Sequence, residues 1–162
     1  MATPKRPNPD RIIDAAMSLA AQSRWREVTL SNIAVEAKIS FVQLHEIYRS
    51  KSEIVAALGD RVDRAVLAET GADVESEPVH DQLLDLLMRR LENLAPHKNG
   101  IASILRDTTC DPGTAICASK DMLRRMAWCL EAVGVGSEGV AGRIRTKGLA
   151  AIYLSTLLVW LH

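Results

Sequence analysis

The chain has 162 residues, of which 48% are hydrophobic and 4% aromatic, so its core must be built from aliphatic side chains. Its 20 Lys and Arg residues balance 20 Asp and Glu residues, and a net charge of zero argues against a generic binder of polyanions. The charges are nevertheless uneven. Residues 1–51 hold eight basic and five acidic side chains, a net charge of +3, which leaves −3 for the remainder.

The cysteines and the two ends of the chain indicate a reduced, cytoplasmic protein. Three cysteines are an odd number without CxxC spacing, and the N-terminus lacks the apolar run of a secretory signal. The apolar stretch from Gly148 to Leu161 covers about 14 residues, which is short for a membrane span. We therefore expect a buried helix there and no membrane association.

The sequence offers little support for catalysis or for a metal. Cys110 and Cys117 match no standard zinc spacing, and we find no catalytic triad motif and no phosphate-binding glycine loop. We predict a protein that is not an enzyme and that holds neither a metal nor a cofactor.

Cap signals divide the first third of the chain into short helices. Residues 1–7 are Pro-rich and basic and should form a disordered arm, after which Asn8 caps a helix with Pro9 at its first position. Further caps are Thr29, Ser40 and Ser50, and the last two are each followed three residues later by Gln43 or Glu53, as in a capping box. Helices should therefore begin near residues 30, 41 and 51.

Residues 29–53 are the most informative part of the chain. Two short helical patterns stand one tight turn apart, with Lys38 and Ile39 in the turn. The second pattern is only about two turns long, and a helix of that length is not stable alone. Neighbouring helices must hold it, as they hold the recognition helix of a helix-turn-helix.

The rest of the chain is also predicted to be helical. The expected helices run from 51 to about 70, from Pro78 to Pro96, near 99–108, from Asp111-Pro112 to Ala132 with a stop at Gly134, and from a cap at Ser137 to the end, with an acidic linker at 71–77. We find no strand pattern and predict an all-α protein. The last helix ends without a cap or polar tail, so we expect that the native chain continues or that a partner subunit covers this end.

Residues 10–60 resemble the TetR family of transcriptional regulators. The resemblance rests on Ile12-Ile13-Asp14-Ala15-Ala16, Thr29, Ile33-Ala34, Ala37, Ile39-Ser40, Leu44, Tyr48 and Ser50-Lys51-Ser52-Glu53, which stand at the family's spacing. It implies a TetR-like fold with a three-helix DNA-binding head at 1–50 and a helical ligand-binding and dimerisation domain at 51–162 that lacks a last helix. It also implies a homodimer that binds a double-stranded DNA operator as a repressor and is released by an unknown small-molecule effector.

The resemblance also implies which residues contact DNA. The expected set is Thr29, Lys38, Ser40, Phe41, Gln43, His45, Glu46, Tyr48 and Lys51. Thr29 and Lys51 would contact phosphates at helix N-termini. Gln43 suits adenine, Phe41 a thymine methyl group and Glu46 a cytosine amino group.

The chain departs from the family in and next to the recognition helix. Members commonly have glycine in place of Lys38 and Val42, lysine in place of Phe41, tyrosine in place of His45 and proline in place of Arg49. The recognition helix therefore carries no Lys or Arg and one Glu. His45 could contact a phosphate or be an ordinary surface residue.

These departures leave other functions open. The chain could be a TetR-fold protein that has lost DNA binding and carries a lipid or another apolar molecule, or a helical protein-interaction module. Candidates to line a ligand cavity are Met88, Leu91, Ile104, Met122, Met126, Trp128 and Tyr153, although methionines at helical spacing are more often core residues. For the dimer interface we expect Ile152, Leu154, Leu157, Leu158 and Trp160 of the last helix.

Overall fold

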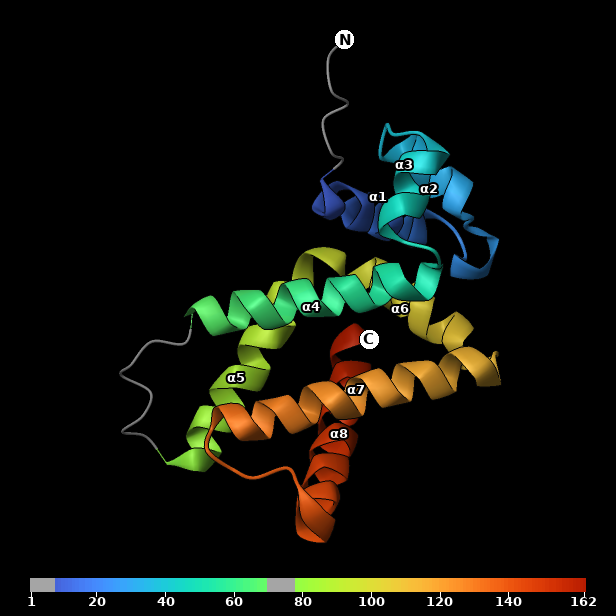
Figure 1. The fold of residues 1–162 in the computed structure, drawn as a ribbon. Coiled ribbons are helices and arrows are strands. Elements are labelled where there is room, and N and C mark those ends of the chain that lie inside the picture. Colours follow the sequence, from blue (N-terminus) through green and yellow to red (C-terminus); the bar gives the residue numbers. More distant parts are fainter. Residues whose placement is uncertain (1–7, 70–77) are drawn as a thin grey trace. The chain divides into compact units, whose positions relative to one another are not determined.

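Helices make up all the regular structure in residues 8–69 and 78–162, the ranges that this computed structural model describes (Figure 1). The predicted all-α fold is thereby confirmed. The arm at 1–7, the linker at 71–77 and the predicted helix stop at Gly71 lie outside the described residues. The chain divides into two compact units: the first is the chain up to Asp60 together with His97–Pro112, and the second is Arg61–Pro96 together with Gly113–His162.

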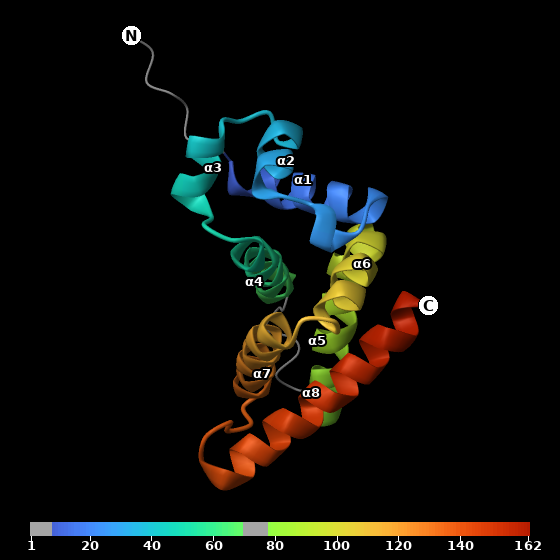
Figure 2. The ribbon, with the colours of Figure 1, turned by 90° about the vertical axis from the view of Figure 1, so that its right-hand side faces the viewer.

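The first unit contains the predicted three-helix head and one more helix. Its elements are α1 (Pro9–Gln22), the 3-10 turn η1 (Trp25–Glu27), α2 (Leu30–Glu36), α3 (Phe41–Ile47), the first part of α4 (Lys51–Glu69) and α6 (Lys98–Thr108) (Figures 1 and 2). The sequence-based boundary between residues 50 and 51 placed α6 in the C-terminal domain, whereas α6 packs on α1. The head is therefore larger than the sequence indicated.

Contacts between distant parts of the chain hold α6 against α1 and η1. A Cβ on Gly100 would lie 2.7 Å from the carbonyl oxygen of Met17, so the two helices can approach this closely only because residue 100 is a glycine. The Ser103 hydroxyl accepts a hydrogen bond from the backbone N–H of Trp25 at 3.2 Å. These two residues are 78 positions apart, and sequence periodicity carries no information about such a pair.

Side-chain caps start the helices of the head where the sequence predicted them. The Asn8 side chain accepts from the Asp10 N–H, and Thr29 and Ser40 each form a reciprocal capping box, with Asn32 and Gln43 respectively. A box at the start of α4 was also predicted and forms only in part. The Ser50 hydroxyl accepts from the Glu53 N–H at 3.1 Å, but the Glu53 carboxylate accepts from the Arg49 N–H, at 2.7 Å.

The turn between α2 and α3 is a Schellman motif that has lysine in the place usually taken by glycine. The Ile39 N–H donates to the Ala34 carbonyl and the Lys38 N–H donates to the Val35 carbonyl, both at 3.0 Å. Lys38 has a φ of +56°, a left-handed conformation that is unfavourable for any residue with a Cβ. The same motif ends α7, where Gly134 occupies the equivalent position with a φ of +76°.

Replacing Lys38 by glycine is therefore expected to stabilise the protein, by about 1 kcal/mol, because it removes the steric cost of the left-handed conformation. Chemical denaturation of the variant and the parent measures the difference. Lys38→Ala is the matched control, since it removes the same charge and keeps the strained conformation. An equal gain from both variants would show that charge, and not backbone conformation, is responsible.

The second unit contains the remaining part of α4 together with α5 (Val79–Leu94), α7 (Pro112–Ala132) and α8 (Gly139–Leu161), while the 3-10 turn η3 (Ala95–His97) joins α5 to α6. Its core is mainly aliphatic, with Val62, Val66, Leu86, Leu91, Leu94, Met126, Cys129, Leu130, Leu149, Tyr153 and Leu157 buried. On α5, Leu84 and Met88 are 53% and 48% exposed, so Met88, a predicted cavity-lining residue, does not lie in the core. Arg90 is buried instead, because its charge is neutralised inside the unit.

The predicted cap of α8 was also wrong. The helix begins at Gly139, and Glu138 precedes it without a side-chain cap bond. The Ser137 N–H instead donates to the carboxylate of Glu131 at 2.6 Å, an interaction that lowers the pKa of Glu131. Gly139 has a φ of +71°, which glycine adopts readily, so the chain can enter the helix without a capping side chain.

The last helix, α8, is apolar on two opposite faces. Leu149, Tyr153 and Leu157 are buried within the second unit. Leu157 had been predicted at a dimer interface, and its burial within the subunit corrects that prediction. The opposite face exposes Val140, Ile144, Ile152, Leu154, Leu158 and Val159. By length and composition α8 could also cross a membrane, but one such helix is weak support for that reading.

Candidate nucleic-acid interface

The recognition helix α3 is anchored by a single buried side chain. Leu44 is fully buried, whereas Phe41, Val42, His45 and Glu46 are exposed. The rings of Phe41 and His45 lie on one side of the helix, with centroids 6.3 Å apart. Of the predicted DNA-contacting residues within α3, Phe41, His45 and Glu46 are therefore exposed, and Gln43 is half-buried.

Gln43 has a structural role that limits how it can read a base. Its Oε1 accepts from the backbone N–H of Ser40 at 3.0 Å and from the Ser40 hydroxyl at 3.2 Å. Pairing with adenine through both amide atoms would require this oxygen to leave the cap. With the cap intact, Gln43 can offer a base only its Nε2 donor group.

Thr29 and Lys51 were predicted to contact phosphates, and both already have partners within the head. The Thr29 hydroxyl donates to the Asn32 side chain at 2.6 Å and accepts from the Asn32 N–H. The Lys51 Nζ donates to the carbonyl oxygens of Trp25 and Val28, both at 2.7 Å, and lies 4.7 Å from the centroid of the Trp25 ring.

Lys51 thus joins the start of α4 to the segment that precedes α2. Burial lowers the pKa of Lys51, and the nearby carboxylate of Asp107 opposes that shift. An ammonium group has three N–H donors, so one remains that could reach a phosphate oxygen. The phosphate contact stays a prediction, now with a second, structural role for the same side chain.

Arg11, Lys38 and Arg49 are basic residues of the head that lie outside α3. Arg11 donates to the carbonyl of Ala37 at 3.2 Å and so ties α1 to the end of α2. Lys38 and Arg49 are exposed on either side of α3, and Tyr48 is half-buried at its end. Phosphate contacts supply most non-specific affinity for DNA, so flanking positive charges can position a helix that has none.

The predicted ligand-cavity residues are not all brought together. Leu91, Met126 and Tyr153 are buried in the second unit, Met122 and Trp128 are half-buried, Met88 is exposed, and Ile104 belongs to the first unit with α6. The interior of the second unit also holds charged side chains that sequence reasoning missed. Among the described residues, the buried polar or charged ones are Arg90, Arg125 and Thr146.

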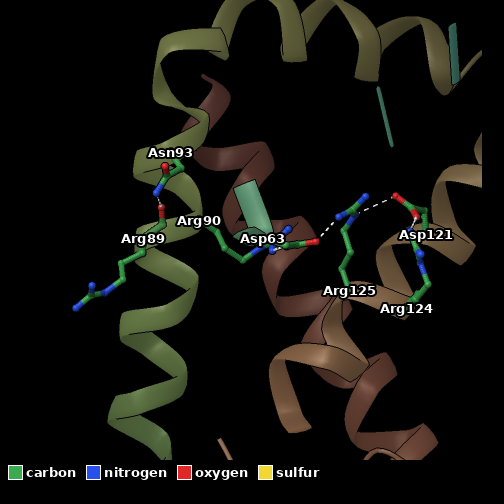
Figure 3. A network of polar contacts seen from close by, with 7 residues as sticks. All are labelled: Asp63, Arg89, Arg90, Asn93, Asp121, Arg124 and Arg125. Carbon is green, nitrogen blue, oxygen red and sulfur yellow. Dashed lines mark hydrogen bonds and ion pairs between the residues drawn. The ribbon is translucent and has the colours of Figure 1, made fainter. Parts of the chain in front are cut away.

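Figure 3 shows that the two buried arginines share one carboxylate, that of Asp63 on α4. Arg90 and Arg125 both donate to Asp63 through Nη1, and the Arg125 Nε donates to Asp121 at 3.0 Å. Arg124, which is exposed, also pairs with Asp121. A sequence signal was present, since Arg90 stands at helical spacing with Leu86 and Leu94 on α5, but a long charged side chain at such a position usually reaches solvent.

The two short capped helices α2 and α3, joined by a tight turn, place the head in the class of helix-turn-helix proteins. No protein-family model matches the sequence, and neither does any curated protein. Among solved structures, a TetR transcriptional regulator from Nitrosomonas europaea ATCC 19718 matches with a TM-score of 0.78 and 26% identity, covering 95% of this chain and 85% of that one. A TetR transcriptional regulator from Rhodococcus sp. RHA1 matches with a TM-score of 0.61 and 19% identity, over 91% and 82%. The resemblance to the TetR family, first seen in residues 10–60, is confirmed over almost the whole chain.

Proposed function

We propose that this protein is a TetR-like transcriptional regulator that binds operator DNA as a homodimer and represses transcription until a small molecule releases it. The observation that carries the proposal is the geometry of α2 and α3: two capped helices of seven residues each, joined by a Schellman turn and held by Leu44. A helix this short persists only where a scaffold supports it, and the scaffold here leaves the outer face of α3 exposed.

Selection of double-stranded DNA from a random pool by the purified protein tests the proposal. Selection at about 50 and 200 mM salt would separate sequence preference from the salt-dependent phosphate contacts. A palindromic consensus that survives the higher salt supports the regulator. If no sequence is enriched even at the lower salt, the regulator proposal fails.

Gln43 provides a sharper test of base reading. Gln43→Glu keeps an acceptor for the Ser40 N–H, because glutamate at this position also completes a capping box, but it removes the amide donor that would face a base. We expect Gln43→Glu to lose about 1–3 kcal/mol of discrimination at one base pair while the stability of the head is retained. Thermal unfolding measures stability and DNA titration measures discrimination. A preference left unchanged would exclude Gln43 as a base reader.

The exposed face of α8 supports the homodimer. Its six apolar side chains lie opposite the face that is buried in the second unit, and a large contiguous apolar surface usually marks an interface. We expect Ile152→Lys to shift the protein from dimer to monomer in sedimentation at micromolar concentration.

The matched control for this variant is Ile116→Lys on α7. Ile116 is 57% exposed and Ile152 is 62% exposed, so the two substitutions place the same charge on similarly accessible isoleucines. Ile116→Lys should leave the dimer intact. Equal dissociation by both variants would argue against α8 as the specific interface.

A second candidate function is carriage of a lipid or another apolar molecule by a TetR-fold protein without DNA binding. The observation that favours it is the outer surface of the head, where Val35, Phe41 and Val42 are 76%, 49% and 66% exposed and α3 has no Lys or Arg. Failure of the DNA selection, together with an apolar molecule detected by native mass spectrometry of the purified protein, would support this alternative.

A further inference from the structure

Among its described residues, the second unit buries two arginine side chains and no carboxylate to the same degree. The side chains of Arg90 and Arg125 are 4% and 7% exposed and meet one carboxylate, that of Asp63, which is 19% exposed (Figure 3). The next carboxylate, that of Asp121, is 29% exposed and is shared between Arg125 and the exposed Arg124. Removing ions from water is costly and is compensated only where every group is well paired.

Two polar atoms in this region are not paired. The Arg90 Nε and the Tyr153 hydroxyl are buried and have no hydrogen-bond partner among the described residues. They belong to neighbouring groups, because the Arg90 guanidinium carbon lies 5.6 Å from the centroid of the Tyr153 ring. Burial raises the pKa of Tyr153, and the charges of Arg90 and Arg125 oppose that shift. Buried donors without partners are rare in folded proteins, and here one belongs to the Arg90 guanidinium and the other lies on the neighbouring Tyr153.

We propose that Arg90, Arg125 and Tyr153 bind the carboxylate of an apolar small molecule, and that Asp63 occupies the arginines when that molecule is absent. A guanidinium offers its N–H groups in a planar fork that matches a carboxylate. The Arg90 Nε and the Tyr153 hydroxyl supply donors that Asp63 leaves unused. The ligand carries one negative charge, because exchange of one carboxylate for another leaves the buried charge unchanged.

The remainder of the ligand is apolar, since the other buried side chains described in this unit are apolar except for Thr146, whose hydroxyl donates to the Gly142 carbonyl at 2.9 Å. Met126 follows Arg125 directly on α7 and is fully buried. Leu91 and Leu149 are also buried. Methionine adapts its shape to irregular partners, which allows an alkyl or aryl group to be accommodated. The occupant is therefore a monocarboxylic acid with a hydrocarbon body.

This assignment gives the effector of the proposed regulator a chemical class, and its regulatory part rests on that proposed function. Asp63 lies on α4, a helix that contributes residues to both units. When a ligand carboxylate takes over the two arginines, α4 loses the two ion pairs of Asp63 within the second unit. The same helix carries Lys51 and Ile54 of the head, so the ligand changes the constraints on an element that the DNA-binding unit also uses.

Decanoate, below its critical micelle concentration, is a suitable probe, and 1-decanol, below its solubility limit, is the uncharged control. Thermal unfolding of the full chain is measured with each compound for the parent, for Asp63→Asn and for Asp121→Asn. Decanoate should raise the unfolding midpoint of Asp63→Asn more than that of the parent, because the competing carboxylate is gone, while 1-decanol should have little effect. Asp121→Asn should respond like the parent, because Asp63 still occupies both arginines.

Tyr153→Phe provides a test that does not depend on the stability of Asp63→Asn. It removes a hydroxyl that has no hydrogen-bond partner among the described residues, so folding should be retained, while the dissociation constant for decanoate, measured by calorimetry, should rise about tenfold. Equal responses to decanoate and 1-decanol, or an affinity that Tyr153→Phe leaves unchanged, would overturn the proposal.

The two proposals fail in distinguishable ways. Decanoate binding is measured without DNA. If the protein selects DNA but does not bind decanoate, only the ligand assignment falls. If it binds decanoate but selects no DNA, the ligand assignment stands, and the chain is a carrier of acids and not a regulator.

Discussion

Replacing Asp63 by leucine is expected to lower the free energy of unfolding by about 3–5 kcal/mol, because it leaves two buried guanidinium groups without their shared carboxylate. The physical cause is desolvation. Arg90 and Arg125 are almost fully buried, so water cannot replace the lost partner. A loss of this size is a large fraction of the stability of a typical domain, and urea denaturation of the variant and the parent measures it.

Asp85→Leu is the control for this prediction. Asp85 also pairs with an arginine of the same unit, Arg89, at 2.7 Å, but the two side chains are 43% and 29% exposed. A pair that water reaches contributes about 1 kcal/mol or less, so this variant should be close to the parent. A similar decrease in the free energy of unfolding in both variants would mean that burial does not determine the energetic effect of removing the carboxylate.

A variant that replaces all three groups separates charge burial from packing. Asp63→Leu combined with Arg90→Met and Arg125→Met removes the carboxylate together with both guanidinium groups. Buried ion pairs can often be exchanged for apolar residues of similar size with little loss, so this variant should recover most of the stability. It should also lose the response to decanoate, which connects the stability of the network to its proposed use.

The second large effect is expected at the recognition helix. Leu44→Ala should lower the free energy of unfolding by about 2–5 kcal/mol because of the cavity that it leaves. We expect α3 to be the first element to unfold. Leu44 is the buried side chain of a helix of only seven residues, and such a helix is not stable without its anchor. Amide hydrogen exchange should show α3 opening while the protection of α7 and α8 is retained, and DNA binding should be lost.

Val42→Ala serves as the matched control on the same helix. Val42 is 66% exposed, so its truncation should change stability by no more than about 0.5 kcal/mol. If Val42→Ala destabilised α3 as much as Leu44→Ala, the helix would depend on a contact of its outer face, and the assignment of that face to DNA would be wrong.

Much of the head could be predicted because its signals are local. Asn8, Thr29 and Ser40 each hydrogen-bond a backbone N–H two or three positions along the chain, and these interactions are visible in the order of the residues. The same is true of the turn at Lys38, where the TetR family commonly has glycine and this chain has a positive φ. The residues expected to face DNA on α3 came from the resemblance to the TetR family, and exposure agrees for Phe41, His45 and Glu46, whereas Gln43 is half-buried.

The tertiary structure alone decided the features that depend on distant pairs. The contact of α6 with α1 rests on Gly100 and Met17, and the burial of Arg90 rests on Asp63, which lies 27 positions earlier in the chain. Helical periodicity reports which face of one helix is apolar and says nothing about what another helix brings to it. The sequence by itself therefore determined the helices, the caps and the family resemblance. Which charges could be buried, and which glycine permits close packing, depended on partners that only the fold brings together.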